Sequence, residues 1–160
     1  MDSLILSGNN LSGPIPDVLT EMTALTVFDV ERNALSGPAV VDLSGLGIES
    51  YRVSANRLTG TIPASVGSVT SLRELWMADN MIVGNIPEDI GNLKRLDTLY
   101  LYSNVITGTI PLSMGSLSLS QVQLHQNLLI GNIPESFYNN TAYNLILYLM
   151  REQFYWSFIL

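Results

Sequence analysis

The sequence repeats itself every 23 or 24 residues, and this period constrains the fold more than any other feature. An asparagine recurs six times, at intervals of 24, 23, 24, 24 and 23 residues. Each asparagine is followed after two positions by an apolar residue and after four positions by glycine. Such agreement over six periods predicts a solenoid, in which every repeat stacks on its neighbours. The recurring asparagines are Asn9, Asn33, Asn56, Asn80, Asn104 and Asn127.

An alternating apolar pair precedes each asparagine. Alternation with a period of two predicts a short strand with one buried face. About 18 residues separate one pair from the next, which is long enough for the crossover that parallel strands require. The sequence therefore predicts one curved sheet of parallel strands. The pairs are Leu4/Leu6, Phe28/Val30, Tyr51/Val53, Leu75/Met77, Leu99/Leu101 and Val122/Leu124.

The other recurring residues have separate physical roles. Asparagine carries both a donor and an acceptor, so a stacked ladder of six can satisfy main-chain groups of the turns that follow the strands. The glycine suits a tight position without room for a side chain. Five repeats continue with Ile-Pro, where the proline fits the start of a short helical turn. The second repeat has Ala39-Val40 instead.

These motifs resemble the plant-type leucine-rich repeat, whose pattern is LxxLxLxxNxLxGxIPxxLGxLxx. Residues 80–93, NMIVGNIPEDIGNL, follow that pattern almost letter for letter. The resemblance implies an α/β solenoid, a curved right-handed superhelix with a parallel concave β-sheet and short 3-10-like turns on the convex side. We expect six repeats over residues 1–142. Residues 143–160 are expected to form a degenerate seventh repeat or an apolar tail, since Glu152 and Trp156 replace the asparagine and the glycine.

Composition excludes several classes of function. The 160 residues carry a formal net charge of −7, no cysteine and one histidine. Without a basic cluster, a nucleic-acid partner is not expected. Thiolate and multi-histidine metal sites are also excluded. No catalytic triad can be built around His125, so we predict no enzyme, no cofactor and no metal. No transmembrane segment is predicted, because Arg151 and Glu152 interrupt the most apolar stretch.

The residues between the inward apolar pairs should face the concave surface. There Trp76, Tyr100 and Tyr102 are expected to form an exposed aromatic patch beside Arg52. Aromatic residues next to arginine are typical of interface hot spots, and exposed apolar patches usually bind something. In the alternative interpretation, Arg52 pairs with Asp29 and stacks on Trp76 inside the domain. The candidate partner-binding residues are Asp29, Arg52, Glu74, Trp76, Tyr100, Tyr102, Gln123 and His125.

An extended surface without a closed pocket favours a binding module over an enzyme. The resemblance implies recognition of a protein or peptide, as in receptor-like kinases, receptor-like proteins and inhibitors of cell-wall hydrolases. It also implies an extracellular or cell-surface location for the full-length protein, although the sequence alone leaves the compartment unknown. Two alternatives stay open. One is ice binding through threonines such as Thr59 and Thr107, and the other is a truncated, non-functional fragment of a receptor.

Further expectations concern glycosylation and the ends of the chain. Asn10 and Asn139 each begin an N-x-S/T sequon and are candidate glycosylation sites. Family ectodomains usually begin with a cysteine-bearing cap, and this sequence has none. Terminal repeats without polar caps leave core positions open, so self-association through the ends is expected.

Overall fold

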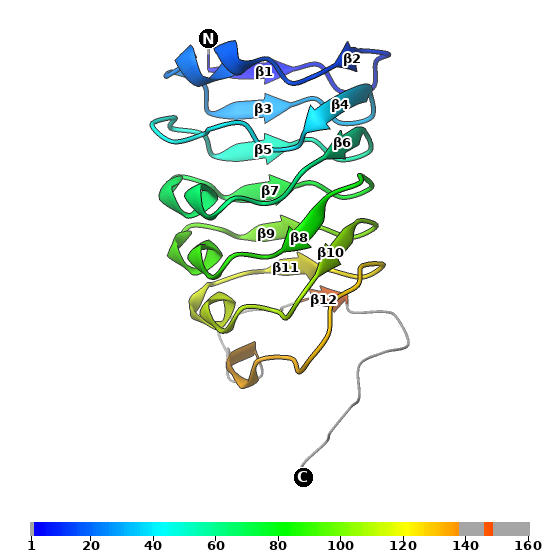
Figure 1. Ribbon diagram of the computed structural model, residues 1–160. Coiled ribbons are helices and arrows are strands. Elements are labelled where there is room, and N and C mark those ends of the chain that lie inside the picture. The colour runs from blue at the N-terminus through cyan, green and yellow to red at the C-terminus, as the bar shows by residue number, and fades with distance from the viewer. Residues whose placement is uncertain (1, 138–145, 149–160) are drawn as a thin grey trace.

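The computed structural model describes residues 2–137 and 146–148, and they form a stack of similar turns (Figure 1). Seven parallel strands form the main sheet, in the order β1-β3-β5-β7-β9-β11-β12. The parallel sheet predicted from the sequence is therefore confirmed. Its strands are β1 (Ser3–Ile5), β3 (Val27–Asp29), β5 (Ser50–Arg52), β7 (Glu74–Trp76), β9 (Thr98–Tyr100), β11 (Gln121–Gln123) and β12 (Ile146–Tyr148).

Each of the first six strands begins and ends one residue earlier than its apolar pair. The reason lies in the carbonyl of the pair's second residue. The Leu101 carbonyl, for example, accepts from the side chains of Asn104 at 3.1 Å and Asn127 at 2.9 Å. Side chains rather than a neighbouring strand satisfy that carbonyl, so the ladder stops there.

The apolar pairs point into the core, as predicted. In repeats two to six, both members of every pair are at most 3% exposed. The register stacks equivalent residues directly, so that Leu75 pairs with Leu99 and Leu99 with Val122. The first repeat differs, because Leu4 is half-buried and Leu6 is 37% exposed. Among the described strands, β1 lies at the edge of the sheet and pairs only with β3.

The asparagine ladder ties neighbouring repeats together through the main chain. The amide of Asn104 donates to the carbonyls of Met77, Leu101 and Tyr102 at 3.0–3.3 Å, and its oxygen accepts from the Ile82 N–H at 2.9 Å. Asn33, Asn56, Asn80 and Asn127 repeat this pattern. Asn9 bonds only within its own repeat. Burial varies along the ladder, since Asn104 is buried, Asn9 is exposed and the other four are half-buried.

A second set of short strands follows the asparagines and forms another wall of the stack (Figure 1). These strands are β2 (Ser12–Gly13), β4 (Ala34–Pro38), β6 (Arg57–Thr59), β8 (Val83–Asn85) and β10 (Val105–Thr107). The glycine four residues after each asparagine has a φ of 78–89°. A Cβ on Gly13 would meet nothing within 4 Å, so lack of room is not the common reason for this glycine. The common reason is the left-handed backbone conformation, which glycine adopts without strain.

Short 3-10 turns form the opposite wall, at the left of Figure 1. They are η1 (Asp17–Glu21), η2 (Ala64–Ser68), η3 (Glu88–Asn92), η4 (Leu112–Ser116) and η5 (Glu135–Phe137). Proline lies one residue before each of these five turns rather than at their first position. Its carbonyl closes the turn, as in the 3.1 Å bond from the Ile90 N–H to Pro87. The second repeat lacks Ile-Pro and has no 3-10 turn within the described part of the chain.

The last described strand extends the sheet by one member. Strand β12 pairs with β11 in parallel, with Leu147 opposite Val122. Assignment of residues 143–160 to a degenerate seventh repeat or an apolar tail stays a prediction. Residues 138–145 and 149–160 lie outside the described residues, and with them the sequon at Asn139.

Candidate functional site

The central part of the main sheet places three large side chains in one row. Arg52, Trp76 and Tyr100 end strands β5, β7 and β9, and the register sets them opposite one another. Trp76 lies between Leu75 and Met77, which are fully buried, so the pleat turns its ring toward the concave surface. The placement predicted for these residues follows directly from the burial of their neighbours.

Together with Arg52, the rings form a chain of contacts across four repeats. The guanidinium carbon of Arg52 lies 4.4 Å from the Trp76 ring centroid, and the Trp76 and Tyr100 centroids are 5.0 Å apart. Tyr100 and Tyr102 follow at 6.4 Å, and Tyr102 stacks on His125 at 4.7 Å with an angle of 7° between the planes. We call Trp76, Tyr100, Tyr102 and His125 the concave aromatic row.

The row is less exposed than the sequence suggested. All four of its residues are half-buried, whereas an exposed patch was expected. The reason is mutual packing, because each ring covers part of the next. The Trp76 indole N–H is buried and has no hydrogen-bond partner among the described residues. A buried donor without an acceptor lowers stability, and native structures contain few of them.

Arg52 belongs to an internal network, which is the alternative that the sequence left open. Glu74 Oε2 accepts from Arg52 Nε at 3.0 Å, from Arg52 Nη2 at 2.5 Å and from Ser50 Oγ at 2.6 Å. Asp29 Oδ2 lies 3.9 Å from Arg52 Nη1. Two carboxylates and one indole ring therefore hold the guanidinium in place, over the first part of the row.

Asp29 corrects an expectation from the sequence. It was expected to face a partner, yet it is only 7% exposed. Its other oxygen accepts the Glu31 N–H at 3.1 Å, so both oxygens are directed at the chain itself. Asp29 acts as support for Arg52, while Arg52 and Glu74 stay half-buried at the surface.

The concave positions two residues before each ladder asparagine, which include Glu31 and Tyr102, carry a negative charge that the sequence analysis did not single out. Burial raises the pKa of Glu31, a hydrogen bond from Ser54 opposes that rise, and the charge of Asp29 adds to it. Burial also raises the pKa of Tyr102, and the nearby charges of Asp79 and Glu31 raise it further. Two small buried residues, Ser54 and Ala78, occupy the equivalent positions on the two repeats between Glu31 and Tyr102. Small residues at these two positions were the feature of the sequence that could have predicted the influence of Glu31 on Tyr102.

The far end of the row is polar. Gln123 is half-buried and lies opposite Tyr100 in the register. The Tyr100 hydroxyl donates to Gln121 Oε1, a contact that the sequence analysis missed. Along the concave face, the polar groups beside the aromatic row thus change from Arg52 on β5 and Glu74 on β7 to glutamines on β11. Among the described residues no group of three or more His, Asp or Glu could hold a metal, and no helix is long and apolar enough to cross a membrane.

Comparison with known proteins agrees with this architecture. The family described as Leucine Rich Repeat matches residues 1–22, 71–93 and 95–117. A solved plant peptide hormone receptor, RGFR1 in complex with RGF2, superposes with a TM-score of 0.91 at 31% identity, covering 96% of this chain and 25% of that chain. In the BIR3–SERK2 complex from Arabidopsis thaliana, a chain 30% identical matches with a TM-score of 0.73, covering 82% of this chain and 70% of that chain. The chain is a plant-type leucine-rich repeat protein.

This plant-type leucine-rich repeat protein spans a small part of its curated relatives. Two Arabidopsis thaliana proteins, STRUBBELIG-RECEPTOR FAMILY 3 and the LRR receptor-like serine/threonine-protein kinase GSO2, are 31% and 36% identical over 77 and 72 residues. The chain covers 10% and 6% of their lengths. A plant ice-binding protein is also similar, with a TM-score of 0.86 at 28% identity, covering 94% of this chain and 49% of that chain.

Proposed function

We propose that this chain is a recognition module that binds a protein or peptide partner on its concave face. The observation that carries the proposal is the continuous concave aromatic row, four half-buried rings that run across the strands of neighbouring repeats. The similarity to peptide-hormone receptor ectodomains supports it. An extracellular or cell-surface location of the full-length protein fits the same relatives.

The physical chemistry of the row favours binding. Trp, Tyr and Arg are the residues that most often carry binding energy at protein interfaces. Here the rings are already held by one another and by Arg52, so little side-chain freedom is lost when a partner docks. The leucine-rich repeat fold is typically non-enzymatic, and we propose that this chain has no catalytic activity of its own.

A peptide selection tests the proposal and does not require the natural partner. A displayed library of random dodecamers is selected on the folded chain, and the enriched peptides are measured by calorimetry against the wild type and two variants. Trp76→Ala should lower the affinity for the selected peptides by at least ~30-fold, because a Trp at the centre of an interface commonly contributes ~2 kcal/mol of binding free energy. Leu112→Ala, which removes a side chain 74% exposed on η4, is the control. Equal affinity for all three proteins would contradict the proposal.

Ice binding is the second candidate, and the similarity to a plant ice-binding protein is what favours it. The candidate threonines form an interrupted row on the second set of strands. Val83 occupies the position of Thr59 and Thr107 in the repeat between them. The hydroxyls of Thr59 and Thr107 both approach main-chain carbonyls at 3.2 Å. Thermal hysteresis measured on the purified chain tests this candidate, and a value equal to that of a control protein of similar size would remove it.

A further inference from the structure

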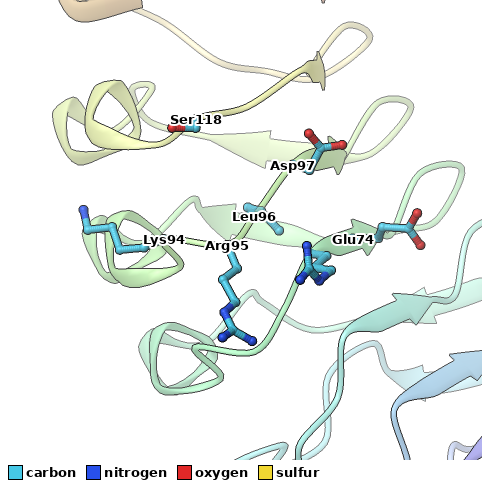
Figure 2. A pocket seen from close by; sticks show the side chains of 7 residues that line it. Glu74, Lys94, Arg95, Leu96, Asp97 and Ser118 are labelled. Carbon is cyan, nitrogen blue, oxygen red and sulfur yellow. The ribbon is translucent and has the colours of Figure 1, made fainter. Parts of the chain in front are cut away.

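A hollow of about 370 Å³ opens on the flank of the stack, where the chain passes from the 3-10 turns into strands β7 and β9. It lies apart from the concave aromatic row, whose rings contribute nothing to its lining. Three of the seven Lys and Arg residues of a chain with net charge −7 gather around it. The lining, shown as sticks in Figure 2, consists of Arg73, Glu74, Lys94, Arg95, Leu96, Asp97 and Ser118.

The two carboxylates of the lining are already engaged elsewhere. Glu74 accepts from Arg52 and Ser50 on the concave side. Asp97 accepts from Ser120 Oγ at 2.6 Å and from Thr98 Oγ1 at 3.1 Å. Figure 2 shows both carboxylates directed away from the guanidinium of Arg95. Among the described residues, neither carboxylate forms an ion pair with a cation of the lining.

The cations, by contrast, have weak partners. Arg73 Nε lies 3.5 Å from Glu49 Oε2, and both side chains are about half exposed, at 55% and 46%. Lys94 Nζ donates to the hydroxyl of Ser116 at 2.8 Å, which is a neutral acceptor. Arg95 is exposed and has no carboxylate within 4.0 Å among the described residues. An exposed ion pair such as that of Arg73 is weak and can exchange its partner.

We propose that this flank hollow binds a carboxylate carried by an acidic segment of a peptide or protein partner. A guanidinium presents two parallel N–H donors that match the two oxygens of a carboxylate. Glu74 and Asp97 repel any anion at this rim, so the expected affinity for one carboxylate is weak. The rest of this acidic chain repels anions, so an acidic segment would be directed to this flank.

The test uses probes of defined chemistry. A blocked hexapeptide of glycine with two glutamates is titrated into the isotope-labelled chain, and the side-chain N–H signals of arginine are followed by NMR. The matched peptide with two glutamines and sodium sulfate are titrated in parallel. The glutamate peptide should shift the Arg73 and Arg95 signals, with weak affinity that falls as salt is added. The glutamine peptide should leave these signals in place.

Variants separate this site from the concave face. Arg95→Gln should lower the affinity for the glutamate peptide by about fivefold, which is the effect expected for the loss of one exposed charge pair. Arg57→Gln, at an exposed arginine of β6 on the opposite wall, should change it by less than twofold. Trp76→Ala should leave the affinity for the glutamate peptide unchanged. The proposal for the flank hollow can therefore be correct even if the proposal for the concave face fails. Equal binding of both peptides, sulfate binding more tightly than the glutamate peptide, or equal effects of the two arginine variants would overturn the inference.

Discussion

The guanidinium carbon of Arg52 lies 4.4 Å from the centroid of the Trp76 ring, while its nitrogens are held by Glu74. This single contact joins the two interpretations that the sequence left open. Arg52 is internally paired, as a structural residue would be, and Trp76 is still half-buried at the concave surface. A pre-stacked ring that keeps part of its area accessible can both stabilise adjacent repeats and contact a partner.

Trp76 variants separate these two contributions. Trp76→Ala removes contacts with Arg52 and Tyr100 and should lower the free energy of unfolding by about 1–3 kcal/mol. Trp76→Phe keeps a ring between the same neighbours and should cost less than ~1.5 kcal/mol. Urea denaturation followed by circular dichroism measures both. A Trp76→Phe variant as unstable as Trp76→Ala would show that the indole itself, and not ring stacking, stabilises the sheet.

The asparagine ladder predicts unequal costs along the chain. Asn104→Ala leaves the Ile82 N–H without its acceptor inside a buried turn and should cost about 1–3 kcal/mol. The carbonyls that Asn104 also binds keep a second donor each, from Asn80, Asn127 or the Asp79 N–H. Asn9→Ala removes two bonds within an exposed turn and should cost less than ~1 kcal/mol. Chemical denaturation of both variants gives the comparison. Similar losses at the two positions would mean that the inter-repeat bonds add no stability.

A glycine on the convex wall sets how closely the 3-10 turns stack. An added Cβ at Gly91 would lie 2.4 Å from Ser113 Cβ and 2.9 Å from the Ser113 carbonyl oxygen. Gly91→Ala should therefore force η3 and η4 apart and cost about 1–3 kcal/mol. Gly47→Ala is the matched control, since its Cβ would meet nothing within 4 Å. The control should be neutral or slightly stabilising, and thermal unfolding of the pair decides whether close packing is what Gly91 provides.

The sequence predicted the backbone well because its constraints recur in every repeat. The inward pairs, the asparagine ladder and the parallel sheet each follow from local spacing that six periods confirm. Exposure on the concave face was predicted poorly, because it depends on contacts between side chains about 24 residues apart. Asp29 lies against Arg52 of the next repeat, and Tyr102 stacks on His125 of the repeat that follows it. Neither contact can be predicted from the sequence of a single repeat. The flank hollow was missed for the same reason, since Arg73 and Arg95 belong to different repeats.

Glu31 provides a pH-dependent test of the concave face. Burial raises its pKa above the ordinary value of 4.5, so the folded state binds this proton more tightly than the unfolded chain does. The stabilisation linked to that proton is fully present below pH 4.5 and is lost as pH rises through the folded pKa. At neutral pH the charge of this half-buried carboxylate therefore lowers the free energy of unfolding. Glu31→Gln should unfold at a higher temperature than the wild type at about pH 7, and this advantage should disappear at about pH 4.

Two measurements check that expectation. An NMR titration of the Glu31 carboxyl should give a midpoint above 4.5, and unfolding scans at acidic and neutral pH should show the change in the difference between the two proteins. Leu112→Ala, at an exposed apolar residue of η4, removes no titratable group and is the control, which should show no such pH-dependent difference. A Glu31→Gln variant that is less stable than the wild type at neutral pH would show that the hydrogen bond from Ser54 outweighs burial. The charged Glu31 carboxylate would then stabilise the concave face, and its removal would lower the stability of the folded chain.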